Sequence, residues 1–150
     1  MDTKNSKLLL EQLDRRLRGK SVSPPPTGWI YAVRTAWGMS RRQLGKRLHI
    51  SAQSVKDLEE NEASGAVSLN RLRTAGQALG LQFSYSLRPV AGSLQKILEQ
   101  AAQKAAEEIV RRTSANMQLE QQGNSSARLK KAVRDKTEEL MREIPGYLWE

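Results

Sequence analysis

The chain has 150 residues, enough for one compact domain with an appended element but too few for two large independent domains. Its 25 Lys and Arg against 16 Asp and Glu give a net charge of +9, which favours polyanionic partners. The chain has no cysteine, which excludes disulfides and thiolate metal sites. Its single histidine, His49, cannot form a metal site of the usual histidine kind by itself. No apolar run has membrane-spanning length and no signal-peptide core follows the start, so we expect a cytoplasmic protein without a membrane partner.

The N-terminal segment, residues 1–26, is predicted to be a helix and a proline-rich connector. Residues 7–18 repeat leucine at the spacing of one helix face, and Gly19 can end that helix. Residues 21–26 are Ser-Val-Ser-Pro-Pro-Pro, whose fixed φ angles and missing N–H donors favour an extended chain. A plain linker is the simpler interpretation, and a docking motif for a small recognition domain is the alternative. Residues 1–73 hold 14 basic and 7 acidic side chains, so most of the excess charge lies in this half.

Residues 27–80 are predicted to form a helical domain. Its first helix covers residues 28–37, with Thr27 as its cap and with Trp29 and Trp37 in the core. Its last helix begins at the cap Ser68 and ends at Gly80.

Between these helices, residues 40–59 have the pattern of a helix-turn-helix motif. Two short helices are capped by Ser40 and Ser51 and joined by a turn at His49 and Ile50. Gly45 supplies the small side chain where the helices cross. His49 takes the left-handed turn position, which glycine usually occupies and histidine visits more readily than most residues. Residues 27–80 are therefore expected to bind double-stranded DNA.

In such motifs the exposed N-terminal face of the second helix meets base edges and the first helix crosses the DNA backbone. Gln53 is expected to read adenine, and Ala52 to touch a thymine methyl group. Lys56 reaches a base or a phosphate, whereas Asp57 accepts from cytosine or faces away. The remaining contacts go to phosphate and set register without reading sequence. The predicted DNA-binding residues are Ser40, Arg41, Arg42, Ser51, Ala52, Gln53, Ser54, Lys56, Asp57, Asn70 and Arg71.

Residues 81–90 change from helical spacing to alternation of apolar and polar side chains, which predicts a β-strand. A single strand needs a partner, and this one is expected to pair with its own copy in a homodimer. The predicted dimer-interface residues are Leu81, Phe83, Tyr85 and Leu87.

Residues 91–150 are predicted to be C-terminal helices that form a partner-interaction region. One amphipathic helix begins at Ser93, and a polar loop at residues 121–126 leads to the last helix. The tail Tyr147-Leu148-Trp149 needs an apolar groove, either on its own subunit or on a partner. The predicted fold is thus mainly α, with a five-helix repressor-like helix-turn-helix core, one short dimer-pairing β-strand and a C-terminal helical extension.

No enzyme activity is expected. The only histidine lies in the turn, so no serine or threonine has a histidine base, and no glycine-rich phosphate loop is present. Paired carboxylates such as Glu59-Glu60 and Glu138-Glu139 are typical of solvated helix faces. We predict no catalytic residue, no metal ligand and no cofactor.

Short motifs along nearly the whole chain carry a family resemblance. They are Gly28-Trp29-Ile30, Gly38-Met39-Ser40, Gln53-Ser54-Val55, Leu58-Glu59, Glu62-Ala63-Ser64-Gly65, Ser68-Leu69, Arg111-Arg112-Thr113-Ser114, Met117-Gln118-Leu119-Glu120, Ile144-Pro145 and Leu148-Trp149. With these motifs the chain resembles the mobile mystery protein A family, which is encoded on mobile elements beside a Fic-domain protein. The helix-turn-helix also looks like the phage-repressor class, whose members bind operators as dimers.

The resemblance implies an antitoxin-like regulator that represses its own gene pair and meets a Fic-domain partner through its C-terminal part. Fic inhibitors carry Ser or Thr four residues before a Glu, and no Ser or Thr of this sequence has that spacing. Inhibition of the partner would then be transcriptional, or steric through residues 93–150.

Several functions remain open at this stage. The first is a dimeric repressor that binds a palindromic operator. The alternatives are an antitoxin that acts mainly by binding the Fic partner, a plain phage-type repressor without a toxin and a nonspecific architectural DNA-binding protein. A simpler alternative treats residues 40–59 as a helical hairpin with a charged, solvated face.

Overall fold

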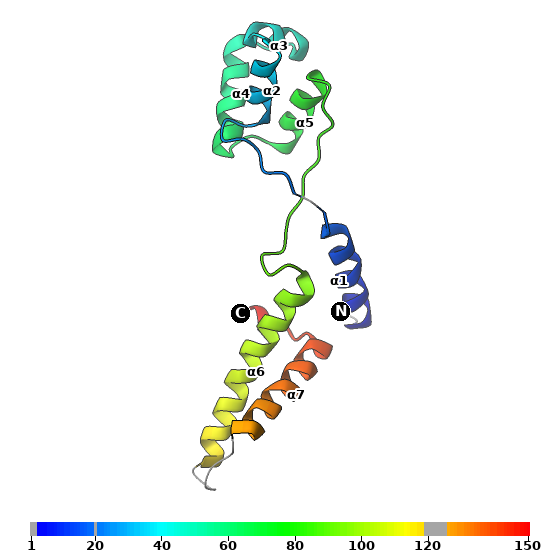
Figure 1. Cartoon of the computed structure of the whole chain (residues 1–150), viewed down its shortest axis with the longest axis vertical. Helices are drawn as coiled ribbons and strands as arrows, with labels where there is room; N and C mark the ends of the chain where they lie inside the picture. The colour runs from blue at the N-terminus through cyan, green and yellow to red at the C-terminus, as the bar shows by residue number, and fades with distance from the viewer. Residues whose placement is uncertain (1–2, 20, 119–125) are drawn as a thin grey trace. The chain divides into compact units, whose positions relative to one another are not determined.

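The structure is a computed structural model that describes residues 3–19, 21–118 and 126–150. These residues form seven α-helices and a short 3-10 helix, so the chain is mainly helical, as predicted (Figure 1). The chain divides into two compact units: residues 21–86, and residues 1–20 together with 87–150. The N-terminal helix therefore belongs with the C-terminal helices rather than with the helix-turn-helix.

The unit of residues 21–86 contains four helices. They are α2 (Trp29–Ala36), α3 (Arg41–Leu48), α4 (Ala52–Ser64) and α5 (Leu69–Ala78). The predicted five-helix core does not form in this unit, because the N-terminal helix packs elsewhere. All four helices contribute to one buried core, and α5 does so through its C-terminal cap as well. The core residues are Ile30, Leu44, Val55, Leu58, Ala75 and Leu79.

Serine caps start three of these helices where the sequence predicted them. The hydroxyl oxygens of Ser40, Ser51 and Ser68 each accept a hydrogen bond from the backbone N–H three residues later, at 3.0 to 3.2 Å. At α3 the cap is reciprocal, because Gln43 Oε1 accepts from the N–H of Ser40 at 2.7 Å. These bonds satisfy N–H groups that the helix itself leaves without a partner.

The start of α2 differs from the prediction that Thr27 caps it. The capping residue is Gly28, and the carboxylate of Glu62 on α4 accepts from the N–H groups of Trp29 at 2.7 Å and Ile30 at 3.0 Å. Gly28 has φ +82°, and a Cβ there would lie 2.7 Å from Glu62 Cδ. A glycine is therefore required where Glu62 approaches α2.

The core placement predicted for Trp29 and Trp37 is wrong, since their exposed fractions are 42% and 57%. Helix α2 has eight residues and buries the face that carries Ile30 and Arg34. Trp29 lies outside that face and Trp37 follows the last helical residue, so neither side chain enters the core.

A buried ion pair joins α2, α3 and α4. The Arg34 guanidinium donates from Nε to Glu59 Oε1 and from Nη2 to Oε2, and its Nη1 donates to the Met39 carbonyl at 2.7 Å. Arg41 Nε donates to Glu59 Oε2 at 3.0 Å. The side chains of Arg34 and Glu59 are only 8% and 3% exposed, so these contacts replace most of their hydration. The expectation that Glu59 lies on a solvated helix face is therefore wrong, whereas Glu60 is exposed.

The predicted strand is absent from the single chain. Residues 81–89 form no strand, because no segment of the described residues pairs with them. The alternation is still visible, since the rings of Phe83 and Tyr85 lie on one side with centroids 6.2 Å apart. Leu81 packs against the core, and the Phe83 ring lies under the guanidinium of Arg73 at 5.3 Å, whereas Tyr85 and Leu87 are exposed.

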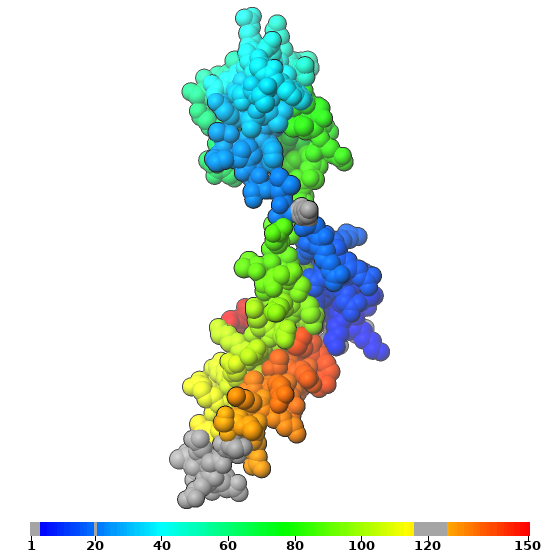
Figure 2. All heavy atoms as spheres, viewed as in Figure 1, coloured from blue at the N-terminus to red at the C-terminus, as the bar shows by residue number. Residues whose placement is uncertain are grey.

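The second unit contains α1 (Thr3–Leu17), α6 (Leu94–Gln118), α7 (Ser126–Glu143) and the 3-10 helix η1 (Gly146–Trp149). Helices α6 and α7 run antiparallel side by side, and their side chains meet along the pair (Figures 1 and 2). Their shared core consists of Ala102, Ala106 and Leu140. The two alanines permit a close approach of the helix backbones.

Helix α1 is fixed to the start of α6 by a buried carboxylate. Asp14 accepts hydrogen bonds from the N–H groups of Leu94 at 2.7 Å and Gln95 at 3.1 Å, and Ser93 caps the same terminus as predicted. In the tail, Leu148 packs on the chain's own α6–α7 core while Tyr147 and Trp149 remain exposed. The predicted loop at residues 121–126 lies almost entirely outside the described residues.

We predict that Glu59→Gln destabilises the unit of residues 21–86 by about 3–5 kcal/mol, because it leaves the buried Arg34 guanidinium without its counter-charge. Urea unfolding, followed by the fluorescence of Trp29 and Trp37 in a Trp149→Phe background, measures the change. The matched control is Glu60→Gln, which removes an exposed pair with Lys56 and should cost less than about 1 kcal/mol. Equal losses in both variants would contradict the structural role of Glu59.

Candidate functional site

The candidate site begins with the turn between α3 and α4. The two helices are joined by His49, Ile50 and Ser51, the short connection of a helix-turn-helix. His49 has φ 56° and ψ 40°, so the predicted left-handed turn residue is confirmed. The N–H of Ile50 donates to the Gly45 carbonyl at 2.9 Å, which closes the turn.

Gly45 is the position where this turn comes closest to α3. A Cβ on Gly45 would lie 2.6 Å from the carbonyl oxygen of Ile50, well inside any normal contact. Val55, on the next helix, is fully buried. The predicted need for a small residue at position 45 therefore has a direct steric cause.

Helix α4 presents a polar face opposite its buried one. Ala52, Gln53 and Asp57 are exposed, while Val55 and Leu58 lie in the core. Gln53 Nε2 donates to Asp57 Oδ1 at 3.0 Å, one helical turn away. The start of the helix thus has a small apolar side chain beside an amide whose orientation is held by a carboxylate.

The N-terminus of α3 carries backbone donors as well as cations. Its cap uses the N–H groups of Ser40 and Gln43, and among the described residues none accepts from the N–H groups of Arg41 and Arg42. Free N–H groups at a helix N-terminus attract anions because the helix dipole adds to their partial charge. This end of α3 is suited to a phosphate.

Besides the capping serines and the pair of Gln53 and Asp57, three more of the predicted DNA contacts bind other side chains of the chain. Arg41 bonds Glu59 at 3.0 Å, Lys56 pairs with Glu60 at 3.8 Å, and Asn70 Oδ1 accepts from Arg73 at 2.7 Å. The Lys56 pair is largely exposed and therefore weak. Arg41 is held by a buried carboxylate, so it anchors α3 to α4 in addition to any contact that it makes outside the chain.

Five cations in the described part of this unit have no ion-pair partner: Arg42, Lys46, Arg47, Arg71 and Arg73. Arg47 donates to the Ala78 carbonyl at 3.0 Å and Arg73 to Asn70 at 2.7 Å, so Arg42, Lys46 and Arg71 are the ones whose side chains have no bond there. Lys46 is not among the DNA contacts predicted from the sequence. It follows Arg42 by four residues on α3 and is likewise exposed, so both charges lie on one helix face. The four-residue spacing of Arg42 and Lys46 in the sequence could have predicted that the two cations share one face of α3.

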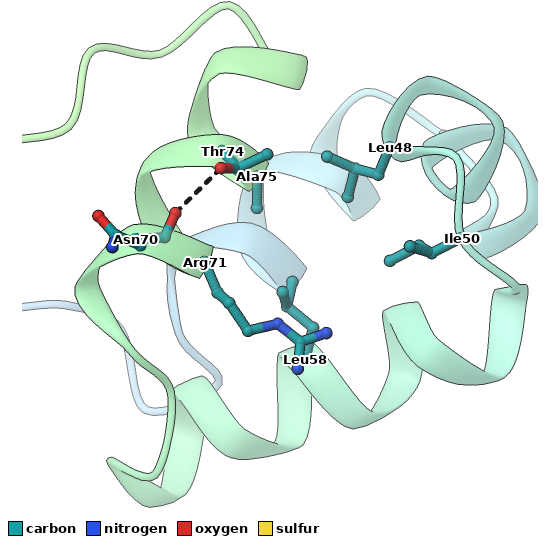
Figure 3. A pocket seen from close by; sticks show the side chains of 7 residues that line it. All are labelled: Leu48, Ile50, Leu58, Asn70, Arg71, Thr74 and Ala75. Carbon is teal, nitrogen blue, oxygen red and sulfur yellow. Dashed lines mark hydrogen bonds between the residues drawn. The ribbon is translucent and has the colours of Figure 1, made fainter.

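Arg71 and Asn70 lie at the start of α5, where they line a hollow of about 210 Å³ (Figure 3). Its apolar wall includes Leu48 and Ile50 from the end of α3 and the turn, and Leu58 from α4. The structure thus brings the predicted contacts at residues 70 and 71 to the helix-turn-helix, although they are distant from it in sequence.

Metal sites, membrane-spanning helices and similarity to known proteins would each be a further indication of function. No group of three or more metal-ligating His, Cys, Asp or Glu side chains occurs among the described residues. None of the helices in the described ranges combines the length and apolarity needed to cross a bilayer. Comparisons with protein-family models, with curated proteins and with solved structures found no match.

We predict that Gly45→Ala destabilises the unit of residues 21–86 by about 1–3 kcal/mol, because the new methyl group meets the Ile50 carbonyl. The control is Gly76→Ala on α5, where the nearest atom to the new Cβ is 3.7 Å away. That control should gain up to about 1 kcal/mol from helix propensity. Urea unfolding of the two variants should therefore shift in opposite directions, and a stabilised Gly45→Ala would contradict the close approach.

Proposed function

We propose that this protein is a cytoplasmic, sequence-specific DNA-binding transcriptional regulator that acts as a homodimer. The observation that carries the proposal is the helix-turn-helix of α3 and α4, whose exposed Gln53 side chain stands at the start of the second helix. The unpaired Arg42, Lys46 and Arg71 supply positive charge on α3 and α5. This arrangement suits major-groove recognition better than a solvated helical hairpin.

In the proposed complex, α4 enters the major groove with its N-terminal face toward the bases. Gln53 and Ala52 meet base edges, whereas Ser51 and Ser54 lie at the helix start near the DNA backbone. The free N–H groups and cations of α3 bind phosphate and set the register. Sequence preference then comes from α4, and most of the salt-dependent affinity comes from α3 and α5.

The proposed dimer forms through the extended segment at residues 81–88. Its backbone groups have no strand partner in the part of the chain that the structure describes, and Tyr85 and Leu87 are 69% and 77% exposed. Pairing with a second copy would bury those side chains and satisfy the backbone. A two-fold dimer matches a palindromic operator, which compensates for the short recognition face of one subunit.

The family resemblance adds an operon context to this proposal. The regulator would repress its own gene pair and serve as the antitoxin of a Fic-domain neighbour. Direct binding of that neighbour is the alternative role, and the unit of α1, α6 and α7 is its proposed site. Several exposed apolar side chains of the unit support that assignment, among them Leu8, Leu9, Leu13, Tyr147 and Trp149.

The experiment that tests the function is selection of bound duplexes from a random pool, followed by footprinting. We expect a discrete protected palindrome with half-sites about 34 Å apart. In salt titrations, Arg42→Ala and Lys46→Ala should each reduce the slope of log affinity against log salt by about 1. Lys104→Ala, which removes an exposed cation of α6, is the control and should leave the slope unchanged. Uniform coating without a selected sequence would support the architectural alternative instead.

A separate prediction concerns the dimer. Tyr85→Lys with Leu87→Lys should give a folded monomer with weaker operator binding, because both residues are exposed in the single chain and like charges would oppose pairing. Gln82→Lys with Ser84→Lys changes the other side of the segment and is the control. Sedimentation equilibrium should show dimers for the unmodified chain and for the control. Dimers in the Tyr85 and Leu87 variant would exclude this interface.

A further inference from the structure

The Gln53 and Asp57 pair on α4 has an arrangement that simple solvation does not explain. Asp57 has no cation partner among the described residues, and its neighbour Lys56 pairs with Glu60. Its bond to Gln53 Nε2, at 3.0 Å, is its one side-chain hydrogen bond in that part of the chain. A carboxylate on a DNA-facing helix also repels phosphate and so lowers the affinity for DNA. A second role for Asp57 would explain why it stands there.

The carboxylate determines which way the Gln53 amide faces. An ionised Asp is only an acceptor, whereas an amide has a donor end and an acceptor end. The bond therefore requires the NH₂ group of Gln53 to face Asp57, because the reversed amide would bring its oxygen against the carboxylate. The hydrogen-bond network thus assigns the amide orientation.

From this geometry we propose that Asp57 is a positioning residue that makes Gln53 selective for adenine in the operator. This inference rests on the proposed function. Asp57 holds one N–H of the amide, and the second N–H remains beside Oε1 as an adjacent donor and acceptor. Adenine offers the complementary pattern in the major groove, with N7 as acceptor and the N6 amino group as donor.

The selectivity arises because Asp57 stops the Gln53 amide from rotating. Guanine presents two acceptors, O6 and N7, so a freely rotating Gln53 can direct both of its N–H groups at guanine and leave Oε1 to water. With Asp57 in place, the available edge carries both a donor and an acceptor in a fixed order. Bases other than adenine then leave at least one of these groups without a partner, which costs binding free energy.

The chain itself suggests a conservative replacement. On α6, Gln103 Nε2 donates to Glu107 Oε1 at 3.1 Å across the same four-residue spacing. Glu at position 57 should therefore also hold the Gln53 amide. Asp57→Glu keeps the acceptor and the charge, Asp57→Ala removes both, and Glu60→Gln removes one nearby negative charge while leaving the Gln53 partner unchanged.

The test measures the affinity of the full-length chain and its variants for the selected operator and for each base substitution in it. Gln53→Ala identifies the base pair that Gln53 contacts. There the unmodified chain and Asp57→Glu should prefer adenine over guanine by about tenfold or more. Asp57→Ala should reduce that preference to below about threefold while raising affinity for all DNA. Glu60→Gln should raise overall affinity and keep the preference. Circular dichroism verifies that every variant is folded.

An unchanged adenine preference in Asp57→Ala would overturn the inference, as would loss of preference in Asp57→Glu. If Asp57→Ala and Glu60→Gln behave alike, Asp57 acts through its charge alone and the positioning role is excluded. If the unmodified chain selects an operator but Gln53→Ala changes no base preference in it, this inference is overturned and the proposed regulator function stands. If the unmodified chain selects no sequence, the proposed function and this inference fail together.

Discussion

The buried carboxylate of Glu59 is the constraint on which the helix-turn-helix unit depends. It lies on α4, the helix that carries the exposed Gln53, and it binds arginines from α2 and from the start of α3. A buried charge is costly unless it is paired, so any arrangement that separates these helices leaves Glu59 or Arg34 uncompensated. The small apolar core supplies the burial, and the ion pair opposes other orientations of α4 on its neighbours.

Features of this fold that depend on neighbouring residues could be predicted from sequence. The serine caps, the left-handed His49 and the small Gly45 are determined by hydrogen bonds and contacts within a few positions. Each of these signals is local, because a turn or a helix end needs only a few consecutive residues to define it.

Long-range contacts account for most of what the sequence did not show. Glu62 caps a helix that starts 33 residues earlier, and Asp14 caps one that starts 80 residues later, so neither carboxylate has a recognisable local pattern. Trp29 and Trp37 had apparent helical spacing, but the short α2 buries a different face. The alternation at residues 81–88 predicts a strand correctly only if a second chain supplies the partner. In the site, Arg41 was predicted from its charge, but its bond to Glu59 depends on tertiary packing.

One of the two units combines residues 1–20 with residues 87–150, and this affects the order in which the chain folds during synthesis. Residues 21–86 are contiguous and have their own core, so this unit can fold as soon as it leaves the ribosome. Helix α1 emerges before it but has to wait for Leu94 and Gln95 before Asp14 gains its hydrogen bonds. At about 5–20 residues per second, that delay is roughly 4–16 seconds. During this interval α1 has no α6 to pack against. Its Leu10 and Leu17, which are half-buried in the finished fold, then add to the apolar surface that Leu8 and Leu9 present to chaperones or to other chains.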